Sequence, residues 1–140
     1  MQYVSQRIHI HIPRYNWIGF YLIDKKDSSM LLLGPHTGSF TPEAKIMVGE
    51  GLCGLAAATG RVMVTDNVAG DSRCVRVSDL VKSQISVPLM AHGQAAGVLH
   101  VESYFQSTFK PAQERDFLVG CANIVQNCLA GTATRVLVNA

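Results

Sequence analysis

The sequence predicts an α+β domain, in which five or six antiparallel strands form one sheet and two terminal helices pack on one face of it. Two observations lead to this prediction. Aromatic and β-branched runs alternate with short polar turns, which is typical of hairpins and not of parallel β–α–β units. Apolar patterns with helical spacing stand near both ends of the chain. At 140 residues, the chain has the size of a single domain covering residues 1–140.

The first element is the least clearly defined of the series. Residues 2–12 place Val4, Ile8 and Ile12 on one helical face, whereas IHIHI within them alternates like a strand. We favour a short helix that ends before Pro13, because the residue preceding a proline avoids helical backbone angles.

The remaining elements follow from runs of apolar residues and the turn residues between them. The aromatic run NWIGFYLID and the run MLLLG, separated by the charged turn KKDSS, predict a hairpin. Gly60 is expected to cap the C-terminal end of a short helix, because glycine readily adopts the left-handed conformation found at that position. The expected order is strands at 16–24 and 30–34, a loop from Gly34 to Pro42, a strand at 45–49, a helix at 52–60, a strand at 62–66, an irregular polar loop at 66–83, strands at 84–91 and 95–103, and a helix from near Pro111 to about Leu129.

Composition and charge argue against several classes of function. The net charge of +2 comes from twelve basic and ten acidic residues that are scattered along the chain, so we expect no nucleic-acid partner. No apolar run approaches the roughly 18 residues that span a bilayer, so we expect no membrane partner. The N-terminal residues lack a secretory pattern, and we therefore expect a cytoplasmic protein.

The four cysteines indicate neither a metal site nor a cofactor. They form no CxxC pair and have no Cys/His spacing of a zinc site, so we expect no metal and no cofactor. Cys121 and Cys128 share one face of the last expected helix with Phe117 and Ile124, which predicts buried, inert thiols. Candidates for thiol chemistry are therefore Cys53 and Cys74.

The stretch GEGLCG at 49–54 raises the question of a phosphate site. A Walker-type cradle needs Lys-Ser/Thr after its last glycine, and Leu55-Ala56 stands there instead. A dinucleotide site needs a β–α–β unit with parallel strands, and the predicted hairpins argue against a parallel sheet. We therefore interpret the glycines as a structural turn that needs positive φ angles and close backbone packing.

Several segments in this order resemble a GAF domain: NWIGFYLID, VGEGLCGLAAATGRVMVTDNV, DSR, KSQISVPL, GVLHVES and a closing F…RDFL. The resemblance covers roughly residues 3–129. It implies a small-molecule pocket on the sheet face opposite the terminal helices, with the loop at 66–83 as its lid. It also implies a regulatory, signal-sensing module that binds an unidentified small molecule and forms a homodimer through its terminal helices.

The N-terminal half is most similar to one enzymatic branch of that family, free methionine-(R)-sulfoxide reductase. Trp17 and Tyr21 match the aromatic pair that cages the substrate, and Cys53 matches a cysteine of the branch. The attacking cysteine's position, however, holds Val77, and the resolving cysteine's position holds Glu43.

The acidic positions that bind the substrate's ammonium in that branch also differ. They hold Gln84, His100 and Glu102, so one carboxylate of three is retained. We therefore expect a binding module without catalysis; the alternative is a divergent thiol oxidoreductase that uses Cys53 and Cys74. His100 and Glu102 share one sheet face, which indicates either a polar pocket or a partly solvated surface. The expected ligand-binding residues are Trp17, Tyr21, Cys53, Cys74, Val77, Gln84, His100 and Glu102.

Overall fold

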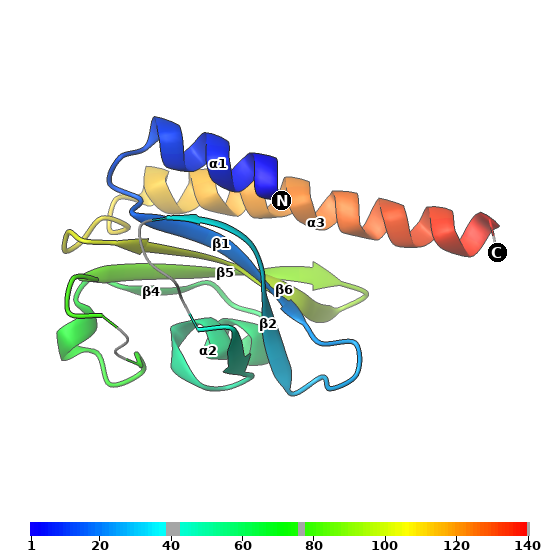
Figure 1. Cartoon of the computed structure of the whole chain (residues 1–140), viewed down its shortest axis with the longest axis horizontal. Coiled ribbons are helices and arrows are strands. Elements are labelled where there is room, and N and C mark those ends of the chain that lie inside the picture. The colour runs from blue at the N-terminus through cyan, green and yellow to red at the C-terminus, as the bar shows by residue number, and fades with distance from the viewer. Residues whose placement is uncertain (39–42, 76–77, 140) are drawn as a thin grey trace.

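One antiparallel sheet separates two layers of helix and loop in this protein (Figure 1). The computed structural model describes residues 1–38, 43–75 and 78–139. Helices α1 (Gln2–His11) and α3 (Ala112–Asn139) cover one face of the sheet, and α2 (Gly51–Thr59) covers the other. The strands are β1 (Trp17–Ile23), β2 (Met30–Gly38), β3 (Lys45–Met47), β4 (Met63–Thr65), β5 (Ser83–Ala91) and β6 (Gln94–Ser103), in the spatial order β3-β2-β1-β6-β5-β4.

These elements confirm the predicted α+β class and the placement of both terminal helices on one face. Residues 2–11 form the favoured helix, and the strand alternative for IHIHI is wrong. Gly60 caps α2 in the left-handed conformation, with φ 67°, as expected. The long loop at 66–83, which we call the lid loop, contains a short 3-10 turn, η1 (Val68–Gly70), and residues 76–77 lie outside the described residues.

The period of two along the central strands produces two separate cores. Ile18 and Phe20 of β1 face the terminal helices, whereas Trp17 and Tyr21 face α2. The larger core lies under α1 and α3 and includes Ile85, Val87, Leu89, Leu99, Val101, Leu118, Ala122 and Val125. The smaller core lies under α2 and includes Leu31, Cys53, Ala56, Ala57 and Val98.

Strand β2 is longer than the sequence predicted. The loop expected from Gly34 begins later, because β2 continues to Gly38 and pairs with the start of β1. Trp17 lies opposite Gly38, and Gly19 lies opposite His36. The turn signal of Gly34-Pro35 is overridden by this pairing, which includes a register shift between Gly19 and Tyr21. Helix α1 is tied to the extension, since the Ser5 hydroxyl lies 3.1 Å from Thr37 Oγ1.

Helix α3 differs from the prediction in length and in the face it buries. It runs to Asn139 and does not end near Leu129. Gly131 lies just beyond Leu129, but a single glycine in a helix costs only about 1 kcal/mol and does not force the helix to end. Its buried stripe consists of Leu118, Ala122 and Val125. The stripe that contains Cys121 and Cys128 is offset from it: Cys121 is half-buried and Cys128 is exposed. The expectation that both thiols are buried is therefore wrong.

The offset stripe of α3 leads to a prediction about assembly. Phe117 is 44% exposed and Ile124 is 64% exposed, and with Cys121 and Cys128 they repeat at intervals of four, three and four residues, as in a coiled-coil seam. The end of α3 also projects beyond the sheet (Figure 1). We propose that a second copy of this chain covers the stripe in a two-fold symmetric dimer.

Analytical ultracentrifugation at tens of micromolar protein should give a mass twice that of the single chain, which is 15.2 kDa. A charge placed on the stripe by Ile124→Glu should shift the protein to the monomer, because the glutamate would be buried without a partner. Asn127→Glu, at an exposed position of the same helix outside the stripe, should leave the dimer intact. A monomeric wild type, or equal effects of both substitutions, would contradict the proposal.

Candidate functional site

The turn GEGLCG places helix α2 against the sheet. Gly49 and Gly51 have φ angles of 96° and 66°, a region that other residues rarely adopt. Gly54 approaches the backbone so closely that an added Cβ would lie 2.5 Å from the carbonyl oxygen of Met47. The glycines therefore form a structural turn, as predicted, and this turn brings Cys53 to the sheet.

A cavity of about 150 Å³ lies between α2, the sheet and the lid loop. We call this cavity the pocket. Its mouth is partly apolar, since Met47 and Val75 are about half-exposed. Val75 of the lid loop lies over Gly51, where an added Cβ would be 3.6 Å from Val75 Cγ2. The described lining residues are Tyr21, Glu43, Lys45, Ile46, Met47, Glu50, Gly51, Leu52, Cys53, Val75, Gln84, His100 and Glu102.

The floor of the pocket is a chain of hydrogen-bonded polar groups on β5 and β6. Gln84 and Glu102 are directly opposite each other in the sheet, and Gln84 Nε2 donates to Glu102 Oε1 over 3.3 Å. His100 Nε2 lies 2.9 Å from the same carboxylate oxygen. His100 Nδ1 lies 2.7 Å from the hydroxyl of Ser86. Alternation along β6 therefore builds a polar pocket floor, and the alternative of a merely solvated face is wrong: His100 is only 5% exposed.

Aromatic rings close the side of the pocket nearest β1. The Tyr21 hydroxyl donates to the carbonyl oxygen of Glu43 over 2.8 Å. Burial, followed by the negative charge on the Cys53 thiolate form and on Glu102, raises the pKa of Tyr21 well above its ordinary value. Trp17 lies behind this wall, with its ring centroid 6.2 Å from that of Tyr21 and 5.9 Å from that of His100. Trp17 is fully buried and is not among the lining residues.

The two candidate thiols differ in their position and surroundings. Cys53 lies in α2, lines the pocket and is 4% exposed. Burial, with a smaller contribution from Glu102, raises the pKa of Cys53 well above its ordinary value. Cys74 is half-buried on the lid loop. Burial and the neighbouring Asp71 raise the pKa of Cys74 to about 11, against a lowering effect of Arg73.

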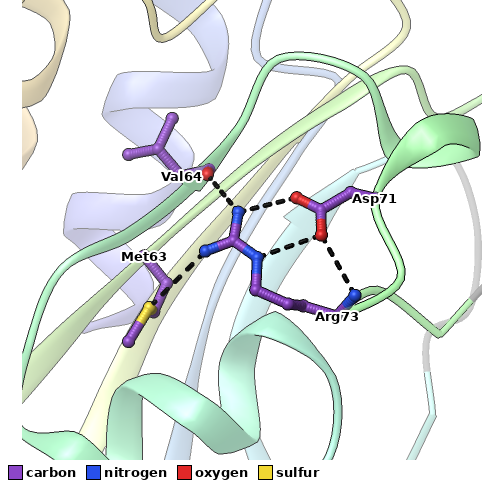
Figure 2. Close-up of polar contacts among 4 residues, drawn as sticks. All are labelled: Met63, Val64, Asp71 and Arg73. Carbon is purple, nitrogen blue, oxygen red and sulfur yellow. Dashed lines mark hydrogen bonds and ion pairs between the residues drawn. The ribbon is translucent and has the colours of Figure 1, made fainter.

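The charged pair of Asp71 and Arg73 in the lid loop is hydrogen-bonded to β4 (Figure 2). Arg73 Nη2 donates to Asp71 Oδ2 over 2.6 Å, and Arg73 Nε donates to Asp71 Oδ1 over 3.0 Å. The same guanidinium donates to the backbone oxygen of Val64 over 2.9 Å. These bonds join the loop segment before Cys74 to the edge strand of the sheet.

Acid should loosen this attachment. The hydrogen bonds from Arg73 hold the pKa of Asp71 far below its usual range. Because the folded-state pKa is depressed, the stabilisation is complete above the unfolded value of about 4 and is lost as the pH falls through the lower folded value. Asp71→Asn should therefore lower the free energy of unfolding at pH 6, and the difference from wild type should shrink below pH 4.

Urea unfolding at pH 6 and at pH 3 measures this difference. The matched control is Asp116→Asn, which removes an exposed carboxylate on α3. If Asp71→Asn and Asp116→Asn give the same small effect at both pH values, the ion pair with Arg73 does not fasten the loop.

The pocket brings together five of the eight residues that the sequence suggested. These are Tyr21, Cys53, Gln84, His100 and Glu102. Trp17 stands behind the wall, Cys74 is adjacent to the lining residue Val75, and Val77 lies outside the described residues. Sequence reasoning did not assign Lys45, Glu50 or Ser86 to the site. The period of two along β5 could have found Ser86, since it points to the same sheet face as Gln84.

The described part of the chain contains neither a candidate metal site nor a candidate membrane-spanning helix. No group of three or more His, Cys, Asp or Glu residues there could hold a metal ion. No helix within the described ranges is long and apolar enough to cross a membrane.

Comparison with known proteins agrees with this geometry. The family model of the GAF domain matches residues 5–130. Protein YtsP of Bacillus subtilis is 29% identical over 126 residues, which are 90% of this chain and 76% of that protein. The free methionine-R-sulfoxide reductase of Escherichia coli is 32% identical over 111 residues, which are 79% of this chain and 65% of that enzyme. This chain therefore spans slightly less than two thirds of the enzyme's length.

Among solved structures, the free methionine-R-sulfoxide reductase from Neisseria meningitidis in complex with its substrate is similar with a TM-score of 0.84. It is 28% identical, and the match covers 94% of this chain and 78% of that one. A six-stranded antiparallel sheet with its pocket opposite the terminal helices defines the class of protein, and the family model covers nearly the whole chain. The chain belongs to the GAF domain family.

Proposed function

We propose that this chain is a ligand-binding regulatory GAF module, which senses a small polar molecule in the pocket and catalyses no thiol reaction. The observation that carries the proposal is the pairing of a polar pocket floor with thiols that are not activated. Gln84, His100 and Glu102 converge on the cavity from two adjacent strands. Their hydrogen bonds to one another fix their positions, which suits recognition of a ligand that offers matching polar groups.

The raised pKa values of Cys53 and Cys74 argue against thiol catalysis. The nucleophile in thiol chemistry is the thiolate. With a pKa of about 11, about one Cys74 thiol in ten thousand is ionised at pH 7, against about three in a hundred for an unperturbed cysteine. Cys53 is still less favourable, because its burial disfavours the charged form and the nearby Glu102 adds to this effect.

The polar groups also differ from those that the reductase resemblance implies. Gln84 and His100 occupy positions where carboxylates would hold the ammonium of the substrate, and only Glu102 remains acidic. Hydrogen bonds to charged groups are worth roughly 1.5–3 kcal/mol each, so the replacement of two carboxylates would weaken the binding of that substrate by a large factor.

A divergent free methionine-(R)-sulfoxide reductase is the second candidate. It is favoured by the relatives with that printed name and by the position of Cys53 on the pocket wall. In such an enzyme the Cys74 sulfur would attack the sulfoxide sulfur and take over its oxygen as a sulfenic acid, which releases methionine. Cys53 would then displace that oxygen as water and form a disulfide, which an external thioredoxin-type dithiol would reduce.

Turnover of free methionine-(R)-sulfoxide with a thioredoxin-type reductant separates the two candidates. We expect wild type, Cys53→Ser and Cys74→Ser to show no rate above the protein-free background. The Escherichia coli reductase, assayed alongside, shows that the assay is working. A wild-type rate that Cys74→Ser abolishes would make this chain an enzyme and would overturn the module proposal.

A further inference from the structure

The indole of Trp17 lies between two imidazoles. Its ring is stacked on that of His36, with centroids 5.7 Å apart and planes at 21°, and its centroid lies 5.9 Å from that of His100. The six-membered ring lies over Gly19, where an added Cβ would be 2.5 Å from Trp17 Cη2. Gly19 pairs with His36 on β2 and with His100 on β6. The missing side chain at Gly19 therefore makes room for the indole, and one imidazole from each neighbouring strand flanks it.

One of these two imidazoles also lines the pocket. His100 is a lining residue, whereas His36 and Trp17 are not. The ring centroid of Tyr21, which lines the pocket too, is 6.2 Å from that of Trp17 and 6.4 Å from that of His100. Trp17 itself is fully buried. His100 and Tyr21 therefore separate the indole from the cavity, and the pocket ends at their rings.

The imidazole of His100 cannot turn aside without losing contacts. Its Nδ1 lies 2.7 Å from the Ser86 hydroxyl, and its Nε2 lies 2.9 Å from Glu102 Oε1. A rotation that cleared the path to Trp17 would break both hydrogen bonds in a buried site, where polar groups without partners are costly. A ligand therefore meets the imidazole as a fixed wall, whichever ring nitrogen carries the proton.

The size of the pocket agrees with this wall. A cavity of about 150 Å³ is well below the roughly 300–1,000 Å³ of pockets that take drug-sized ligands. Beyond the imidazole, the rings of Trp17 and Tyr21 would offer an aromatic surface to a flat or apolar group. A side chain shorter than histidine at position 100 would connect that surface with the cavity. The depth of the pocket therefore depends on His100.

We propose that His100 is a size gate, which closes the aromatic end of the pocket and restricts it to compact polar ligands. A ligand whose inner end carries a ring or a branched apolar group is excluded, because that group would have to occupy the place of the imidazole. His100 is thus a specificity-determining residue by its bulk. The inference rests on the proposed function, because it names the class of ligand that the module takes.

Benzyl alcohol tests the gate, since it has a ring that suits an aromatic surface and one hydroxyl for the pocket floor. In an NMR titration, the Gln84 side-chain amide reports binding, and NOEs between the probe ring and the Trp17 indole report how deep the probe lies. We expect no such NOE in wild type. His100→Ala should produce the NOE and lower the Kd at least about tenfold, because the ring of the probe then becomes buried.

Two variants control for effects other than size. His36→Ala removes the imidazole on the other side of the indole, which does not line the pocket, so the Kd read at Gln84 should stay at the wild-type value. His100→Phe loses the polar contacts of the imidazole but retains a ring, so it should keep the probe away from Trp17. If His100→Ala does not fold, His100→Asn takes its place with the same expectation, because it is shorter than histidine and keeps polar atoms.

Several results would overturn the gate. One is an NOE to Trp17 in wild type, and another is its absence in a folded His100→Ala or His100→Asn variant. Entry of the probe in His100→Phe would show that lost hydrogen bonds open the site, and equal tightening by His36→Ala would show general loosening around the indole. The turnover assay of wild type decides the proposed function separately. A failed gate without turnover leaves the module intact, whereas turnover refutes the module whatever the spectra show.

Discussion

Gly54→Ala should lower the free energy of unfolding by roughly 2–3 kcal/mol and the melting temperature by about 10 °C. The added methyl group would lie 2.5 Å from the carbonyl oxygen of Met47 and 3.1 Å from the backbone nitrogen of Gly49. Both atoms belong to the backbone of a turn that is already constrained by the positive φ of Gly49 and Gly51. No side chain can rotate away, so α2 must move off the sheet.

Gly120→Ala provides the matched control. Gly120 also lies inside a helix, but an added Cβ meets nothing within 4 Å. Alanine there should raise the free energy of unfolding by about 0.5–1 kcal/mol, because it is the better helix former and reduces the freedom of the unfolded chain. Thermal and urea unfolding of both variants measure the two effects. Similar values for the two substitutions would mean that the turn adapts to the methyl group.

Glu114→Ala should cost roughly 2–3 kcal/mol of stability, whereas Glu114→Gln should cost less than about 1 kcal/mol. Glu114, in the first turn of α3, accepts hydrogen bonds from Tyr15 and from Arg14. Tyr15 is fully buried, and burial, followed by the bond to Glu114, raises its pKa well above the ordinary value, so the phenol stays a neutral donor. Alanine leaves that donor without an acceptor, while glutamine still offers a carbonyl oxygen.

The contribution of Arg14 should be small, because its side chain is 58% exposed and water screens the ion pair. A double-mutant cycle isolates the buried bond. Tyr15→Phe removes the donor, so Glu114→Ala in that background should cost at least about 1 kcal/mol less than in wild type. Additive effects would show that the hydroxyl of Tyr15 is satisfied in another way once Glu114 is absent.

The sequence predicted most accurately those features that depend on local periodicity. Alternation along β6 placed His100 and Glu102 on one face, and both line the pocket. Positive φ angles in the turn before α2 could be expected from its glycines, since few other residues adopt them. Each of these features is fixed by two or three neighbouring residues, so one sequence is enough to infer it.

Features that depend on distant partners were missed. The end of β2 pairs with Trp17–Gly19, and no local signal at Gly34-Pro35 predicts that pairing. Two apolar stripes overlap on α3, and only packing against β5 decides that Leu118 is buried and Phe117 is not. Ser86 became part of the site through its contact with His100 on the next strand. Tertiary contacts override local preference in each of these cases.

The position of Trp17 has a practical consequence. It is the single tryptophan of the chain, it is fully enclosed, and its ring lies 5.9 Å from His100 of the pocket floor. Light emitted by this protein under selective tryptophan excitation therefore originates directly behind the wall of the pocket, shielded from water. Any rearrangement of the imidazole changes the immediate surroundings of that fluorophore, so the tryptophan emission of the native protein reports on the state of the pocket floor without an attached dye.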